Sequence, residues 1–384
     1  MSALPPPTAD GLAHSNRLRD AIQHEIALQG GWIPFSRFME LALYAPGLGY
    51  YTAGARKFGA AGDFTTAPEM SALFGRTVAR QLAEIMAQSS RHILELGAGS
   101  GKLAADILTE LEAQGQLPEQ YSILEVSADL RERQQETIRN RLPHLIDRVQ
   151  WLDMLPEQWS GALVANEVLD ALPVHIIHWR ERDIAERGVV SAGESFDWHA
   201  HPVDNAALLE AAQALKLPEN YISEISLAAR GLIRSLSERL QQGAMLWIDY
   251  GFGAREYYHP QRSQGTLMCH YRHHAHGDPF FLPGLQDLTA HVDFTAVAEA
   301  AIDGGAQLLG YTSQAHFLLN AGILDTLRAS ASPDDAAAFL PLSGQVQKLT
   351  SPAEMGELFK VIALGKGIDA PLSGFIRGDF SRLL

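Results

Sequence analysis

Short apolar runs alternate with amphipathic stretches along this chain. Residues 93–96 form a compact apolar run, three glycines follow at alternate positions, and apolar side chains then recur at helical spacing from Leu103 to Leu111. This pattern predicts a strand, a tight turn and a helix. Such a turn presents bare backbone N–H groups and a helix N-terminus, which together can bind a nucleotide.

Further runs of the same kind predict the rest of an α/β sheet. Stretches with helical periodicity separate them, as the crossovers between parallel strands require. The expected strands are residues 121–124, 149–152, 162–165 and 245–248, with a final antiparallel pair at 306–311 and 359–364. Helices are expected at residues 10–28 and 71–88.

Residues 176–239 do not follow this period, and we expect an insertion there. Residues 176–179 and 196–199 flank a charged stretch, as the two strands of a hairpin would, and residues 221–239 look helical. Residues 254–290 look loop-like.

The spacing of the glycine turn excludes two familiar nucleotide sites. A P-loop would need glycine at Leu96 and a hydroxyl residue at Leu103. The dinucleotide fingerprint would need glycine or alanine at Lys102. A turn used only for tight packing stays open from this stretch alone. The remaining pattern, Glu-x-Gly-x-Gly-x-Gly over residues 95–101, resembles the first motif of class I S-adenosylmethionine-dependent methyltransferases.

An acid ends the next predicted strand, at Glu125. An acid in this place chelates the two hydroxyls of a ribose, and the glycine motif before it favours that role over a plain surface glutamate. Asn166 follows the fourth strand, where the carboxyl ends of strands build the site in open α/β sheets. The residues expected to bind S-adenosylmethionine are Glu95, Gly97, Gly99, Gly101, Glu125, Asn166 and Asp63.

Three further strings make the resemblance more specific. They are Gly-Asp-Phe-Thr-Thr-Ala-Pro-Glu at 62–69, Asn-Glu-Val-Leu-Asp-Ala-Leu-Pro at 166–173 and Leu-Thr-Ala-His-Val-Asp-Phe at 288–294. Together they resemble the MidA family, which includes the mitochondrial complex I assembly methyltransferase, and the likeness spans residues 15–365. It implies protein arginine as the acceptor, in a respiratory complex I-type subunit or a similar protein.

The resemblance also implies a fold. We expect an α/β protein with the doubly wound, Rossmann-like sheet of class I methyltransferases, in strand order 3-2-1-4-5-7-6. An N-terminal helical and aromatic cover would span residues 1–88. The methyltransferase domain would comprise residues 89–175 and 240–384, and an inserted substrate lid would span residues 176–239.

Acids are the candidate catalytic groups. Methyl transfer is an in-line displacement, so the protein mainly aligns and desolvates the reactants. An arginine acceptor stays protonated in water, and carboxylates that hold it can orient one nitrogen. Glu167 and Asp170 would share a face of a helical turn and act together, with Glu69 from the cover and His291 as an orienting group. The alternatives are that Glu167 caps a helix, that Asp170 is a surface residue and that His291 is structural.

Composition narrows the class of partner. The 384 residues carry a net charge of −15, which disfavours a nucleic-acid binder and suits a cationic substrate. No apolar stretch approaches the ~20 residues of a membrane helix, so no membrane insertion is expected. The single cysteine excludes an internal disulfide. Because neither a signal peptide nor an Arg-rich presequence is visible at the start, we predict a cytoplasmic protein.

Four histidines within residues 270–276 invite a metal-site interpretation. Metal sites usually draw their ligands from separated, rigid elements. We therefore predict a solvated polar segment and no metal.

Other functions remain open beside an arginine methyltransferase. A small-molecule methyltransferase is the competitor within the same class. A non-catalytic assembly factor that holds S-adenosylmethionine and an NAD(P)-dependent oxidoreductase are the competitors from other classes. The sequence makes no prediction of oligomeric state.

Overall fold

The computed structural model describes residues 4–53 and 66–384, which divide into two compact units. The first, here called the sheet unit, contains residues 66–168, 232–253 and 292–384. The second, here called the cover unit, contains residues 4–53, 169–231 and 254–291.

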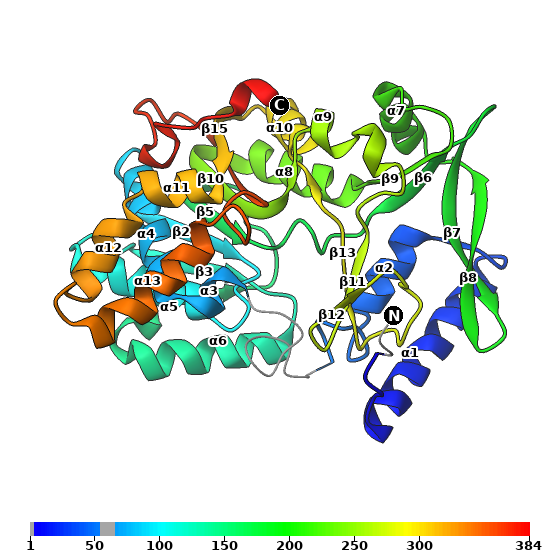
Figure 1. Ribbon diagram of the computed structural model, residues 1–384, viewed down its shortest axis with the longest axis horizontal. Helices are drawn as coiled ribbons and strands as arrows, with labels where there is room; N and C mark the ends of the chain where they lie inside the picture. Colours follow the sequence, from blue (N-terminus) through cyan, green and yellow to red (C-terminus); the bar gives the residue numbers. More distant parts are fainter. Residues whose placement is uncertain (1–3, 54–65) are drawn as a thin grey trace. The chain divides into compact units, whose positions relative to one another are not determined.

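An eight-stranded sheet forms the centre of the sheet unit (Figure 1). Its strands are β2 (His92–Leu96), β3 (Gln120–Leu124), β4 (Val149–Leu152), β5 (Trp159–Asn166), β10 (Leu240–Phe252), β14 (Val292–Asp293), β15 (Gln307–Ser313) and β16 (Phe359–Lys366). They lie side by side in the order β15-β16-β10-β5-β2-β3-β4, and β14 pairs with β10. Numbered along the chain and read from the β4 end, the seven strands of that path have the order 3-2-1-4-5-7-6, the order that the resemblance implied.

The α/β class is confirmed, and strand direction follows the expected scheme. The neighbours from β4 through β10 pair in parallel, whereas β16 runs antiparallel to both β10 and β15. The inner strands are apolar because they are covered by helices. In β5, for example, every residue from Gly161 to Ala165 is buried.

Two helices next to the sheet pack closely on each other: α4 (Ala72–Ala87) and α5 (Lys102–Ala113) (Figure 1). Ser71 caps α4, and its hydroxyl accepts a hydrogen bond from the backbone N–H of Leu73 (3.2 Å). Gly75 permits the close approach, because a Cβ there would lie 2.7 Å from the Cβ of Asp106. The other helices of this unit are α3 (Ala67–Met70), α6 (Ala128–Arg141), α10 (Phe294–Asp303), α11 (Gln314–Asn320), α12 (Ile323–Ser330) and α13 (Ala336–Thr350).

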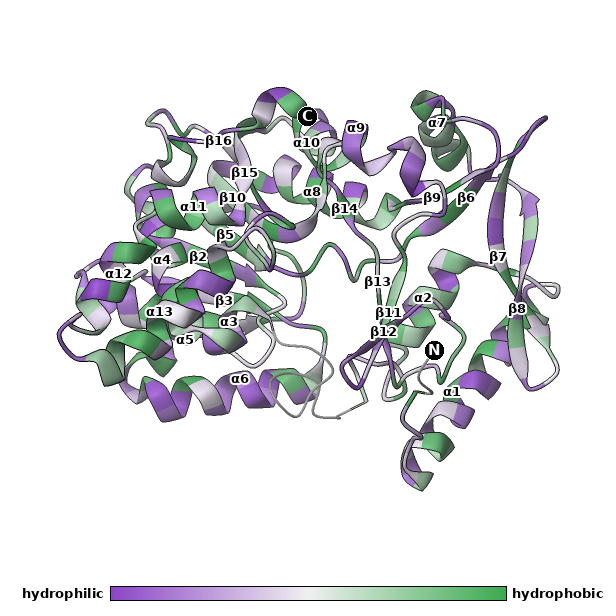
Figure 2. Ribbon diagram, viewed as in Figure 1, coloured by the Kyte–Doolittle hydropathy of each residue, from purple (hydrophilic) through white to green (hydrophobic). Residues whose placement is uncertain are grey.

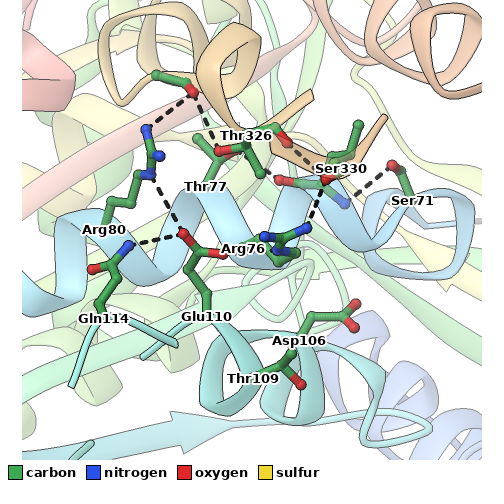
Figure 3. Close-up of polar contacts among 12 residues, drawn as sticks. Ser71, Arg76, Thr77, Arg80, Asp106, Thr109, Glu110, Gln114, Thr326 and Ser330 are labelled. Atoms are coloured by element: carbon green, nitrogen blue, oxygen red, sulfur yellow. Dashed lines mark hydrogen bonds and ion pairs between the residues drawn. The ribbon is translucent and has the colours of Figure 1, made fainter. Parts of the chain in front are cut away.

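A buried carboxylate ties three of these helices together (Figure 3). Glu110 of α5 forms ion pairs with Arg76 (2.7 Å) and Arg80 (3.7 Å) of α4. Arg76 also donates to the hydroxyl of Ser330 at the end of α12 (2.6 Å). The cluster fixes the packing of α12 against α4.

The cover unit contains two smaller sheets. The first has the order β1-β7-β6-β9, with β8 beside β7, and the second has the order β12-β11-β13. The strands are β1 (Ile33–Pro34), β6 (His175–Trp179), β7 (Ile184–Ala192), β8 (Ser195–Pro202), β9 (Tyr221–Ile225), β11 (Met268–Tyr271), β12 (His274–His276) and β13 (Asp287–Thr289). The helices are α1 (Ala9–Leu28), α2 (Phe35–Tyr44), α7 (Ala206–Leu215) and α9 (Ala254–Tyr257). Helix α8 (Leu227–Arg239) begins in this unit and ends in the sheet unit.

Two local predictions were wrong, and a third was right only in part. The charged stretch between the two expected hairpin strands is itself strand β7, which pairs with both β6 and β8. The expected helix at residues 221–239 is present from Leu227 onward as α8, but its first residues form strand β9. Residues 254–290, expected as a loop, contain a short helix and a three-stranded sheet.

The units also group the chain differently from the expected domains. Residues 66–88 were expected in the cover, but they cluster with the sheet. Residues 254–291, which it placed in the methyltransferase domain, cluster with the N-terminal helices. The role of residues 176–239 as a lid stays a prediction.

Within the described ranges, no helix combines the length and the apolar character that a membrane span requires.

Candidate functional site

The glycine turn joins β2 to α5. Gly97, Gly99 and Gly101 have φ values of 64°, 53° and 81°, in the left-handed region that favours glycine. A Cβ at Gly97 would lie 3.0 Å from Val168, and one at Gly101 would lie 2.9 Å from the Cα of Gln134. Packing therefore accounts for two of the three glycines.

The turn also leaves a helix N-terminus without a side-chain cap. Gly101 is the residue before α5 and supplies no acceptor for the first N–H groups of that helix. These groups and their dipole favour an anionic ligand such as a carboxylate. An uncapped helix N-terminus of this kind can hold a carboxylate group.

Glu125 follows β3 and is nearly buried, with 7% of its surface exposed. Its Oε1 accepts a hydrogen bond from the Ser127 backbone N–H (3.0 Å), and its Oε2 accepts one from Gln134 Nε2 (3.0 Å). Burial raises the pKa of Glu125, and these hydrogen bonds oppose the shift. A carboxylate offers about four lone-pair sites, so the fixed carboxylate can accept further hydroxyl donors.

Glu95 lies inside the sheet unit, with 1% of its surface exposed. Tyr121 of the neighbouring strand β3 donates its hydroxyl to Glu95 Oε2 (2.7 Å). Burial raises the pKa of Glu95 to about 8; the Tyr121 hydrogen bond opposes this and the charge of Glu125 adds to it. Burial thus favours the protonated form of the Glu95 carboxyl at neutral pH.

The end of β5 carries Asn166 and Glu167. Asn166 Nδ2 donates to Glu167 Oε1 (3.0 Å), while Asn166 Oδ1 is buried and receives no hydrogen bond from any described residue. Glu167 has a φ of 54°, which is strained for a residue with a side chain. Strain of this kind concentrates at functional sites.

Asp249 of β10 supports this strained turn, and the sequence did not single it out. It has 1% of its surface exposed. Its two carboxylate oxygens accept hydrogen bonds from the backbone N–H groups of Val168 (3.2 Å) and Tyr250 (2.9 Å). The Glu167 N–H donates to the carbonyl of Ile248, one residue earlier in β10 (2.9 Å). In the sequence, Asp249 directly follows the apolar run of residues 245–248, and this position was the signal that could have identified it.

Glu69 contacts the glycine turn. The Ser100 hydroxyl donates to Glu69 Oε1, and Lys102 Nζ lies 3.6 Å from Glu69 Oε2 and 2.8 Å from the Glu69 carbonyl oxygen, to which it donates. The Glu69 carboxylate is therefore engaged with the turn on both sides. Lys102, noted in the sequence only because it breaks the dinucleotide fingerprint, has a structural partner here.

The remaining candidates belong to the cover unit. No residue from 167 to 172 is helical, so the expected helical turn that would join Glu167 and Asp170 is not formed. Asp170 is buried, and its carbonyl oxygen accepts the Ala290 N–H (3.0 Å), next to His291. The His291 backbone N–H donates to the Thr266 hydroxyl (3.0 Å). Asp63 lies outside the described residues.

The histidine-rich segment is an ordered hairpin. It forms β11 and β12, joined through Arg272 and His273, which both have positive φ. In residues 4–53 and 66–384, no three His, Cys, Asp or Glu side chains gather as metal ligands would.

The sheet unit fits S-adenosylmethionine. It brings together the glycine turn, the fixed carboxylate of Glu125 and the buried acceptor Asn166 Oδ1 at the carboxyl ends of adjacent strands. This edge is where open α/β sheets bind nucleotides. The residues present can supply backbone donors, a ribose acceptor and one acceptor for an ammonium or amino group.

Comparison with known proteins agrees with this fit. Residues 74–312 match the family described as "Putative S-adenosyl-L-methionine-dependent methyltransferase". The Drosophila melanogaster "Protein arginine methyltransferase NDUFAF7 homolog, mitochondrial" is 30% identical, over 91% of this chain and 86% of that protein. The Danio rerio "Protein arginine methyltransferase NDUFAF7, mitochondrial" is 29% identical, over 87% of this chain and 83% of that protein.

A solved structure is similar over its whole length. It is a Burkholderia thailandensis protein described as a "likely methyl transferase" and crystallised with S-adenosyl-homocysteine. It is 52% identical, the alignment covers 100% of both chains, and the TM-score is 0.96.

These comparisons overturn one prediction and confirm another. The predicted cytoplasmic location is wrong by this comparison, because the curated relatives are named as mitochondrial proteins. The resemblance read from the three strings is confirmed. The chain belongs to the family of S-adenosyl-L-methionine-dependent methyltransferases that its residues 74–312 match.

Proposed function

We propose that this methyltransferase transfers the methyl group of S-adenosylmethionine to an arginine side chain of a protein. The relatives named as protein arginine methyltransferases support this acceptor, since they align over most of the chain. The net charge of −15 also favours a cationic acceptor. The narrower expectation, a respiratory complex I-type subunit, stays a prediction.

The proposed cofactor site uses the residues described above. Glu125 accepts the ribose hydroxyls, and the backbone of the glycine turn with the N-terminus of α5 holds the carboxylate of the amino-acid end. Asn166 Oδ1, the buried acceptor that no described residue satisfies, takes a hydrogen bond from the cofactor. S-adenosylmethionine supplies an electrophilic methyl group on a sulfonium centre.

Glu167 is the proposed acceptor-holding acid, and its strained backbone is the observation that carries this assignment. Asn166 and Asp249 hold the turn in place, so the carboxylate is preorganised. Held against a guanidinium, it would orient one nitrogen toward the methyl group. The catalytic roles expected for Asp170 and His291, which belong to the cover unit, stay predictions.

For Glu69, the contacts favour a different role from the predicted catalytic one. Its carboxylate is engaged with Ser100 and Lys102 of the glycine turn. We assign it as a positioning residue for the turn.

The test uses S-adenosylmethionine carrying a labelled methyl group and mass spectrometry of arginine-containing proteins. Wild-type protein should produce methylarginine. Glu167→Gln should lower kcat by about 100-fold or more without changing the Kd for S-adenosyl-homocysteine. Glu157→Gln is the matched control, since Glu157 is exposed and precedes β5 at its opposite end.

Other outcomes identify the alternatives. If the labelled methyl group is found only in small molecules, the acceptor is a small molecule and not a protein. Cofactor binding without transfer to any acceptor, and unchanged by Glu167→Gln, would indicate a non-catalytic assembly factor. An NAD(P)-dependent oxidoreductase does not agree with the family to which the chain belongs.

A further inference from the structure

Helix α6 carries a buried polar residue where its pattern calls for an apolar one. The helix is largely hydrophilic (Figure 2), and its buried residues, Leu130, Gln134 and Ile138, recur every fourth position. Gln134 has 0% of its surface exposed. A buried amide is costly unless every polar atom has a partner, so its contacts explain its presence.

Gln134 uses both its donors and its acceptor. Its Nε2 donates to the Gly99 carbonyl oxygen (3.1 Å) and to Glu125 Oε2 (3.0 Å). Its Oε1 accepts from Trp151 Nε1 in β4 (2.9 Å). The indole N–H can only donate, and the carbonyl and the carboxylate only accept, so this orientation of the amide is the one that satisfies all three contacts.

One amide therefore joins the two halves of the proposed cofactor site. The Gly99 carbonyl belongs to the glycine turn, and Glu125 is the proposed ribose acceptor. Thr137, one turn further along α6, donates to the next carbonyl of the turn, that of Ser100 (2.7 Å). The turn is thus attached to the same helix that fixes the acid.

We propose that Gln134 is a positioning residue that sets the Glu125 carboxylate for the ribose hydroxyls and couples it to the glycine turn. This inference rests on the proposed cofactor site and adds a residue that acts through Glu125. The amide suits the task because it is neutral: a carboxylate would repel Glu125, and a cation would neutralise it. Removing a buried partner leaves both the Glu125 oxygen and the Gly99 carbonyl unsatisfied.

The test compares two ligands on the full chain by calorimetry: S-adenosyl-homocysteine and its 2′-deoxyribose analogue. The wild type should bind the ribose form more tightly. Gln134→Glu, which keeps the shape but replaces the donors by oxygen, should weaken binding of the ribose form by about tenfold. The affinity for the deoxyribose form should fall by a smaller factor, so the preference of the variant for the ribose form should be smaller than that of the wild type.

The matched control is Gln135→Glu, the same change one residue along. The Gln135 side chain makes an exposed hydrogen bond with Arg139 (3.1 Å), and this variant should keep the wild-type affinity and preference. If Gln134→Glu does not fold, Trp151→Phe removes only the third anchor of the amide and should also reduce the preference for ribose.

The outcomes separate the two proposals. If the wild type does not bind S-adenosyl-homocysteine, the proposed cofactor site is wrong. If it binds but a folded Gln134→Glu keeps the wild-type affinity, or loses both ligands equally, the role of Gln134 is wrong. An unchanged ribose preference in Trp151→Phe would count against it in the same way.

Discussion

Glu95 belongs to the glycine motif, but its side chain is buried and bonded within the protein. The motif predicts an acid that binds the cofactor, yet the structure places its carboxyl against the Tyr121 hydroxyl, with 1% of its surface exposed. Its partner comes from β3, the strand that also leads to Glu125. Whether Glu95 reaches the cofactor stays a prediction, whereas its protonation has a direct consequence for stability.

The raised pKa makes stability depend on pH. The folded state keeps the Glu95 proton up to a pKa of about 8, while an unfolded chain releases it near 4.5. Between these values the folded state binds more protons, so the free energy of unfolding falls as pH rises, by at most about 1.4 kcal/mol per pH unit. Glu95→Gln should remove this contribution. Urea unfolding at pH 6, 7 and 8 measures it, and the exposed Glu119→Gln is the control.

Gly99 provides the second test at the residue scale. Valine is β-branched and fits poorly at a φ of 53°, and its side chain would obstruct the backbone approach of a cofactor. Gly99→Val should abolish measurable binding of S-adenosyl-homocysteine in calorimetry. Gly115 is a matched control, because its φ is 67°, a Cβ there meets nothing within 4 Å, and it lies beyond the other end of α5. Equal loss of binding in Gly115→Val would show that backbone strain alone is responsible.

The sequence predicted individual site residues with uneven success, for a physical reason. Backbone requirements leave a visible mark, so the three left-handed glycines could be predicted from their spacing. Side-chain partners from distant segments leave none: nothing near Glu69 in the chain indicates Ser100. Gln134 had a faint signal, a polar residue within an apolar stripe, that becomes meaningful only once its three partners are known.

At the scale of elements, an ion cluster around the buried Glu110 carboxylate joins α4, α5 and α12. Glu110 is 5% exposed and pairs with two arginines of α4 (Figure 3). Glu110→Ala would leave both guanidinium groups without their carboxylate and should lower the free energy of unfolding by about 3–5 kcal/mol. Glu112→Ala, which removes an exposed pair with His144, should change it by about 1 kcal/mol or less. Equal effects in chemical denaturation would contradict the structural role of the cluster.

Elements were predictable where they are long and buried. The strands of the central sheet are continuous apolar runs, and all seven of the expected strands are present, with boundaries shifted by a few residues. The elements of the cover unit were harder. Strand β7 carries Glu186 and Arg187 at adjacent positions, and its buried residues do not alternate. Strands β11 and β12 are only three or four residues long and contain histidines, so none of the three strands shows a clear period.

At the scale of the whole molecule, domain boundaries could not be predicted from local pattern. Each unit gathers three separated stretches of the chain. Within the described residues, the chain leaves one unit for the other at residues 168–169, 231–232, 253–254 and 291–292. Packing between distant segments determines this grouping.

The net charge of −15 leads to a last prediction for the whole molecule. An acidic protein attracts a cationic acceptor over a distance, and salt screens that attraction, with a Debye length of about 10 Å at 0.1 M. If the acceptor is an arginine-containing basic protein, kcat/KM should fall by about tenfold between 50 and 500 mM NaCl, while kcat changes little. The Kd for S-adenosyl-homocysteine serves as the control, because that ligand carries no net charge and its affinity should vary far less with salt. A value of kcat/KM that does not respond to salt would argue that the acceptor is recognised through contacts at the site alone, as a neutral small molecule would be.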